Sequence, residues 1–94
     1  MGEIKHKQAG NEGMFYYDVD GEQLAAMVYE MENDHKMLIL HTEVDDSLKG
    51  QGIGKKLQAE LVDFVRANHI KVVPLCPFAN ATFQKTKEWQ DVLA

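Results

Sequence analysis

A glycine-rich segment in the middle of the chain has the composition of an anion-binding turn. Gly50, Gly52 and Gly54 occupy alternate positions, and Lys49 and Lys55 flank them. Glycine lets a backbone approach a ligand closely, and the first N–H groups of a helix have no partner within that helix. Together with the helix dipole, these groups attract anions and above all phosphates. We therefore expect a phosphate-bearing ligand at this turn.

Two common phosphate-binding motifs do not fit this segment. A Walker A loop, G-x-x-x-x-G-K-[ST], fails because Gly50 and Gly54 are one residue too close and Lys56 stands where Ser or Thr is required. The dinucleotide fingerprint G-x-G-x-x-G fails because Lys55 occupies the place of its third glycine. A flexible loop without any ligand is the remaining alternative, and it leaves the flanking lysines unexplained.

Cys76 and His41 are the candidate reactive side chains. Cys76 is followed by Pro77, a residue favoured in the first turn of a helix, and a helix N-terminus stabilises a thiolate. His41 would serve as the base for that thiol or for another nucleophile, with Glu43 acting through water as another base. The alternative interpretations are a small core cysteine and a hydrogen-bonded strand histidine. The four histidines and one cysteine lack metal-ligand spacing, so no metal site is expected.

Composition bounds the class of protein. The 94 residues suit one domain, residues 1–94, and 45% of them are hydrophobic. No apolar run has the length of a signal peptide core or a membrane span, and one cysteine makes no internal disulfide, so we expect a cytoplasmic protein without a membrane partner.

The charge is divided unevenly along the chain. Residues 1–47 carry eleven acidic residues against three lysines, whereas residues 48–94 carry seven basic residues against four acidic ones. The overall charge of −5 argues against a nucleic-acid partner, which selects a broad basic surface. The positive half contains the glycine run, where an anionic small molecule would find its countercharge.

Antiparallel strands are expected in the first half of the chain. Alternating or apolar stretches are separated there by turn residues, including the hairpin signal Asp20-Gly21. The expected strands cover residues 3–8, 14–19, 23–32 and 36–44. Strict alternation along the last of these would place His41 on the same face as Met37 and Ile39.

A helix and a parallel strand are expected in the second half. From Gly52 to about Asn68, apolar residues recur at helical spacing. Residues 70–75 then suit a buried strand, which a crossover of this length makes parallel to the strand at 36–44. Pro77 opens a short helix ending near Lys85, and a docked tail follows. The predicted fold class is α+β, with a mixed sheet.

The glycine segment resembles a known signature. Lys49-Gly50-Gln51-Gly52-Ile53-Gly54 is similar to the acetyl-coenzyme A motif Q/R-x-x-G-x-G/A of the GNAT (N-acetyltransferase) superfamily, with Lys49 replacing Arg or Gln. The spaced His41, the run Cys76-Pro77-Phe78 and the short length extend this likeness. The chain therefore resembles the minimal, roughly 100-residue acetyltransferase-like subfamily of that superfamily.

This resemblance implies a function as well as a fold. It implies a GNAT-like mixed sheet that binds acetyl-CoA as co-substrate and transfers acetyl to an amine of a small molecule or a protein. The backbone from Gln51 to Lys55 would hold the pyrophosphate, and the backbone near Val44 would pair with the pantetheine amides. The implied cofactor-binding residues are Val44, Lys49, Gly50, Gln51, Gly52, Ile53, Gly54, Lys55 and Phe78.

The implied catalytic residues are Cys76, which would carry the acetyl group as an acetyl-cysteine, and His41 as the base. The subfamily lacks the N-terminal helices that usually build an acceptor pocket. The alternative is therefore a regulatory module that binds CoA or acetyl-CoA without turnover.

Overall fold

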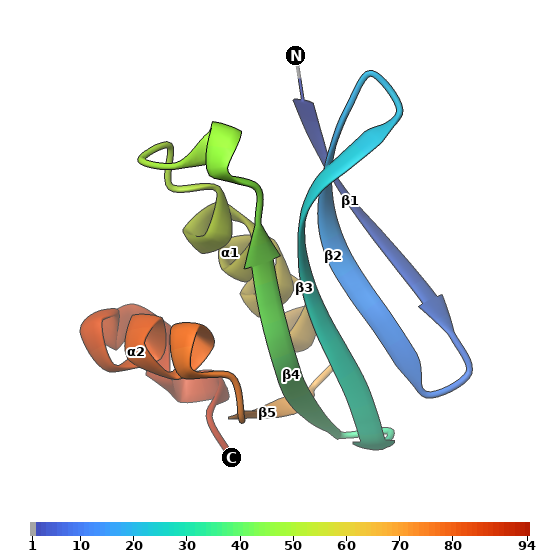
Figure 1. The fold of residues 1–94 in the computed structure, drawn as a ribbon. Coiled ribbons are helices and arrows are strands. Elements are labelled where there is room, and N and C mark those ends of the chain that lie inside the picture. The colour runs from blue at the N-terminus through green and yellow to red at the C-terminus, as the bar shows by residue number, and fades with distance from the viewer. Residues whose placement is uncertain (1) are drawn as a thin grey trace.

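Five strands form one mixed sheet with the spatial order β1-β2-β3-β4-β5 (Figure 1). A computed structural model describes residues 2–94 of the chain. The strands are β1 (Gly2–Ala9), β2 (Glu12–Val19), β3 (Glu22–Asn33), β4 (Lys36–Val44) and β5 (Lys71–Pro74). The first four pair antiparallel, and β5 pairs parallel to β4. The predicted meander and the predicted parallel strand are confirmed.

Two helices and two short 3₁₀ turns complete the fold. They are η1 (Asp46–Leu48), α1 (Ile53–Ala67), α2 (Pro77–Lys85) and η2 (Lys87–Val92). Helix α1 connects β4 to β5 and lies behind the sheet in Figure 1, whereas α2 lies beside β4. The α+β class predicted from the sequence is therefore confirmed. Among residues 2–94, no helix has the length and apolar character needed to cross a membrane.

The core lies between α1 and the sheet. Leu57, Leu61 and Val65, spaced at one helical turn, are completely buried against the sheet residues Met27 and Ile39. Each buried side chain of this size contributes about 1.5–3 kcal/mol relative to an exposed one. The helix ends where expected, because His69 adopts a left-handed φ of 55° and the Ile70 amide donates to the Val65 carbonyl.

An extra residue in β4 changes the face on which its second half projects. Tyr29 pairs with Ile39 and Val28 pairs with His41, so Leu40 has no partner in β3 and forms a β-bulge. Beyond the bulge, Thr42 pairs with the buried Met27 and shares the helix-covered face. The prediction that His41 shares a face with Met37 and Ile39 is wrong, because alternation restarts at the bulge.

The sheet between β4 and β5 is short. Parallel pairing runs from Lys36 with Lys71 to Ile39 with Pro74 and then stops. The Ile39 carbonyl accepts hydrogen bonds from the amides of both Leu75 and Cys76, at 3.0 and 3.1 Å, before the chain turns into α2. Residues 41–44 pair with β3, and among residues 2–94 no strand pairs with the other side of residues 40–44.

An aromatic cluster joins the N-terminal strand to α1. The His6 ring stacks on Phe15, with centroids 4.0 Å apart, and meets the edge of Phe64 from α1. His6 Nε2 lies 2.6 Å from the hydroxyl oxygen of the buried Tyr29. Desolvation by these neighbours lowers the pKa of His6 and raises the pKa of Tyr29, so both groups are held neutral.

The free energy of unfolding should decrease as the pH falls below about 6.5, the ordinary pKa of histidine. The unfolded chain then binds a proton at His6 that the folded chain resists, so acid favours the unfolded state until the folded-state pKa is also passed. Urea unfolding at pH 7.5 and pH 5 measures this loss, which His6→Phe should reduce because the phenyl ring cannot titrate. His69→Asn is the matched control and should keep the full pH dependence. If His6→Phe loses as much unfolding free energy between pH 7.5 and pH 5 as the native chain, His6 is not the cause of the loss.

Candidate functional site

The glycine turn delivers free backbone donors to one point at the start of α1. Gly50 and Gly52 adopt left-handed φ values of 82° and 70°, and Gly52 is the N-cap of the helix. The Lys56 amide already donates to the Gly52 carbonyl. Within residues 2–94, the amides of Ile53, Gly54 and Lys55 have no hydrogen-bond acceptor. These are the donors that the sequence predicts for an anion.

Local hydrogen bonds fix the chain before this turn. The Asp45 carboxylate accepts from the backbone amide and the hydroxyl of Ser47, at 3.0 and 2.5 Å. The hydroxyl bond first, and then the amide bond, hold the pKa of Asp45 below its ordinary value. The Gln51 amide donates to the Leu48 carbonyl at 3.1 Å. Gln51 therefore uses its N–H inside the turn, and the free donors begin after it.

A pocket of about 410 Å³, named here the glycine pocket, opens at this turn. Its lining comes from the end of β4, from the turn, from the start of α1 and from one side of α2. The lining residues are Val44, Leu48, Lys49, Gly50, Gly52, Ile53, Gly54, Lys55, Phe78, Thr82, Lys85 and Thr86. The structure thus brings together the predicted cofactor-binding residues except Gln51.

Positive charge gathers at the glycine pocket. Lys49, Lys55 and Lys85 line it, and among the described residues none of the three forms a salt bridge. An ideal Cβ on Gly54 would lie 2.5 Å from the tip of the Phe78 ring, so this glycine allows α1 and α2 to approach closely. The donor amides and the lysines together form a site suited to a phosphate group.

The sequence analysis named Phe78 of α2 but missed the other two α2 side chains that line this pocket, Thr82 and Lys85. Phe78, Thr82 and Lys85 are spaced by four and three residues, so they share one face of a helix. That spacing is visible in the sequence. The signal went unused because nothing in the sequence alone indicates which face of such a short helix meets the turn.

Cys76 lies at the N-cap of α2 and is nearly inaccessible. Its side chain is 4% exposed, and its Sγ atom lies 3.4 Å from the Thr42 hydroxyl oxygen. Because of the β4 bulge, Thr42 and not His41 faces this thiol. The predicted pair of Cys76 with His41 is not formed in this structure.

His41 instead lines a groove on the uncovered face of the sheet. The row Lys7, Met14, Val28 and His41 crosses four strands on that face. The groove, named here the outer groove, has a volume of about 510 Å³ and includes this row, the bulge residue Leu40 and the rim residue Glu12. His41 is exposed and two residues past the end of the β4–β5 pairing.

The comparisons with known proteins agree with this geometry. The family model described as GCN5-related N-acetyl-transferase matches residues 14–92. The chain belongs to this family. The GNAT resemblance stated from the glycine segment is therefore confirmed. No curated protein sequence matches the chain.

Solved structures share this fold, and the first of them also supports the family assignment. A GCN5-like putative N-acetyltransferase from Staphylococcus aureus is 36% identical, with a TM-score of 0.73 over 98% of this chain and 87% of that one. The ribosomal-protein-S18-alanine N-acetyltransferase from Escherichia coli is 18% identical, with a TM-score of 0.68 over 83% of this chain and 53% of that one. A GNAT family acetyltransferase from Elizabethkingia anophelis, solved with acetyl-CoA bound, is 13% identical, with a TM-score of 0.67 over 89% and 72% of the two chains.

Gly52→Ala should lower the free energy of unfolding by about 1–2 kcal/mol, because an alanine is strained at a positive φ. Gly10→Ala is a matched control at the opposite end of the sheet: its φ is 63°, and a Cβ at either position meets no atom within 4 Å. Urea unfolding should report similar losses for the two variants. An unchanged free energy of unfolding in Gly52→Ala would mean that residue 52 does not need a positive φ at the start of α1.

Proposed function

We propose that this protein binds acetyl-CoA at the glycine pocket and transfers its acetyl group to an amine. The observation that carries the proposal is the convergence of three free amides with Lys49, Lys55 and Lys85 around one pocket. The residues fit a phosphate-bearing cofactor because every polar group named is a hydrogen-bond donor or a cation. A reducing cytoplasm, in which acetyl-CoA is made and the Cys76 thiol persists, suits this activity.

Different residues around the pocket would bind different parts of the cofactor. The amides of Ile53, Gly54 and Lys55 would donate hydrogen bonds to the pyrophosphate oxygens, and the lysines would neutralise the pyrophosphate charge. The backbone of residues 40–44, which has no strand on its β5 side, would pair with the amides of the pantetheine arm as an added strand would. Phe78, which is 42% exposed beside Gly54, offers an apolar wall to the arm.

The glycine pocket and the candidate base, His41, lie on the same strand, β4. Val44 lines the glycine pocket and His41 lies three residues earlier on the same strand, about 10 Å away at strand spacing. His41 would accept the proton that the amine nitrogen loses as it bonds to the acetyl carbon, while the thioester C–S bond breaks and CoA leaves as a thiolate that takes a proton from water. Acetyl-CoA supplies an activated thioester for this step. Exposure of His41 in the outer groove leaves it accessible to an acceptor from the uncovered face.

The geometry favours direct transfer over the acetyl-Cys76 route. Cys76 is buried, its contact is a hydroxyl group, and within residues 2–94 no carboxylate or imidazole hydrogen-bonds to it. Formation of an acetyl-cysteine requires removal of the thiol proton by a base. The thiol instead packs where the chain leaves the sheet, and Thr42 holds it there.

CoA binding is the first prediction of this proposal. Calorimetric titration should give micromolar binding by the native chain and a loss of at least about tenfold in Gly52→Ala, since the strained turn misplaces the free amides. Gly10→Ala should bind like the native chain. No binding at millimolar CoA by a folded native chain would overturn the proposal.

Turnover is the second prediction. Release of free CoA from acetyl-CoA should accelerate when amines are supplied, and His41→Ala should slow it about 10²-fold or more, the usual contribution of a general base. Cys76→Ser should retain most of the rate, and the native chain should acquire no acetyl mass. An acetyl adduct present on the native chain and absent from Cys76→Ser would instead support the cysteine route. Tight binding without amine-dependent release would identify a regulatory module.

A further inference from the structure

Lys55 occupies a position that is electrostatically unfavourable without an anion. It lies in the first turn of α1, where the helix dipole opposes a positive charge, and that turn contains no acidic residue. Its ammonium nitrogen lies 5.9 Å from the centroid of the Trp89 ring. Lys55 therefore has an aromatic partner in place of a carboxylate.

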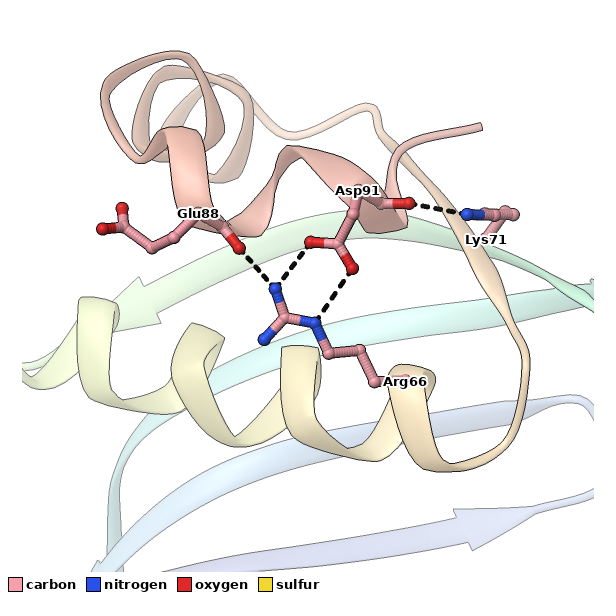
Figure 2. A network of polar contacts seen from close by, with 4 residues as sticks. All are labelled: Arg66, Lys71, Glu88 and Asp91. Atoms are coloured by element: carbon pink, nitrogen blue, oxygen red, sulfur yellow. Dashed lines mark hydrogen bonds and ion pairs between the residues drawn. The ribbon is translucent and has the colours of Figure 1, made fainter.

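A polar network, drawn in Figure 2, fixes the 3₁₀ turn η2. This turn includes Trp89. Arg66 of α1 forms a bidentate pair with the Asp91 carboxylate, with N–O distances of 3.0 and 2.6 Å, and also donates to the Glu88 carbonyl. Lys71 of β5 donates to the Asp91 carbonyl at 2.6 Å. Figure 2 shows that these bonds reach η2 on both sides of Trp89 in the sequence.

The same turn is joined to α2. The Trp89 ring meets the buried Phe83 edge to face, with centroids 6.5 Å apart, and the Gln90 side-chain amide donates to the Phe83 carbonyl at 3.0 Å. The indole is thereby held against both helices that wall the glycine pocket. Trp89 does not itself line that pocket, but Lys55 does.

We propose that Trp89 is a positioning residue that orders Lys55 at the glycine pocket for the phosphates of CoA. This inference rests on the proposed function. A free lysine side chain loses conformational entropy when it is ordered, and the contact with the ring restricts Lys55 before the ligand binds. The ring also leaves the full charge of Lys55 available, because it carries no formal charge. A carboxylate at the same place would compete with the phosphate.

A double-mutant cycle on CoA affinity tests this role. Calorimetry should show that Trp89→Leu weakens CoA binding about fivefold in the native background and that Trp89→Phe, which keeps a ring, weakens it less. In a Lys55→Met background, Trp89→Leu should change the affinity by no more than about twofold, because the group on which it acts is gone. A structural role alone would predict the same loss in both backgrounds.

Lys56→Met is the matched control for the cycle. Lys56 lies next to Lys55 in the same helical turn but does not line the glycine pocket. The fivefold effect of Trp89→Leu should persist in that background. Equal effects with Lys55 present and absent would overturn the inference while leaving the proposed function intact. Failure of the folded native chain to bind CoA would overturn both.

A second measurement does not depend on the folding of the Trp89 variants. Trp89 is the chain's single tryptophan, so its fluorescence reports on this ring alone. Inorganic pyrophosphate should change the emission of the native chain and of Lys56→Met, because an anion bound near Lys55 alters the field at the ring. The change should be absent in Lys55→Met. An unchanged emission at saturating pyrophosphate in the native chain would contradict the coupling.

Discussion

The early end of the β4–β5 ladder is the constraint on which the rest of the site depends. The Ile39 carbonyl accepts hydrogen bonds from the backbone amides of Leu75 and Cys76, and the chain then leaves the sheet toward α2. A ladder that continued would have covered residues 40–44 and filled the space beside them. Because it stops, β4 presents an unpaired backbone edge directly below the glycine turn. The open edge of β4 is thus a consequence of where the pairing ends.

The bulge at Leu40 determines which side chains of β4 face the core and which face the outer groove. Before it, Met37 and Ile39 pack into the core. Beyond it, Thr42 continues on the core side and meets Cys76, while His41 turns toward the outer groove. A single inserted residue therefore separates the thiol from the imidazole. It also leaves the imidazole exposed on the uncovered face of the sheet, which an uninterrupted alternation would not do.

The features that could be predicted from the sequence are those with local causes. Helix α1 was predictable because Leu57, Leu61 and Val65 repeat at helical spacing and His69 ends the pattern. The glycine turn was predictable because positive φ angles at Gly50 and Gly52 are a property of glycine itself. The nine residues assigned to the cofactor were recognised from a motif, and eight of them line one pocket.

The features that escaped prediction depend on register and on distant partners. No residue type marks Leu40 as a bulge, since the pairing of Tyr29 with Ile39 and of Val28 with His41 is decided between two strands. The docking of η2 on α1 depends on Arg66 and Asp91, which are 25 residues apart and unremarkable individually. Contacts of this kind appear only when the chain is folded.

The topology also sets the order in which the molecule can assemble. The first four strands pair with their neighbours in sequence, so each hairpin closes a short loop at little entropic cost. The glycine pocket, in contrast, joins residues near Val44 to residues near Thr86, and η2, still later in the chain, packs against α2. We therefore expect the meander to form before the glycine pocket, whose contacts join more distant parts of the chain. A ligand that holds α1 and α2 together would stabilise the contacts that form in this late step. It would therefore slow local unfolding of the C-terminal part of the chain, which would otherwise unfold before the sheet.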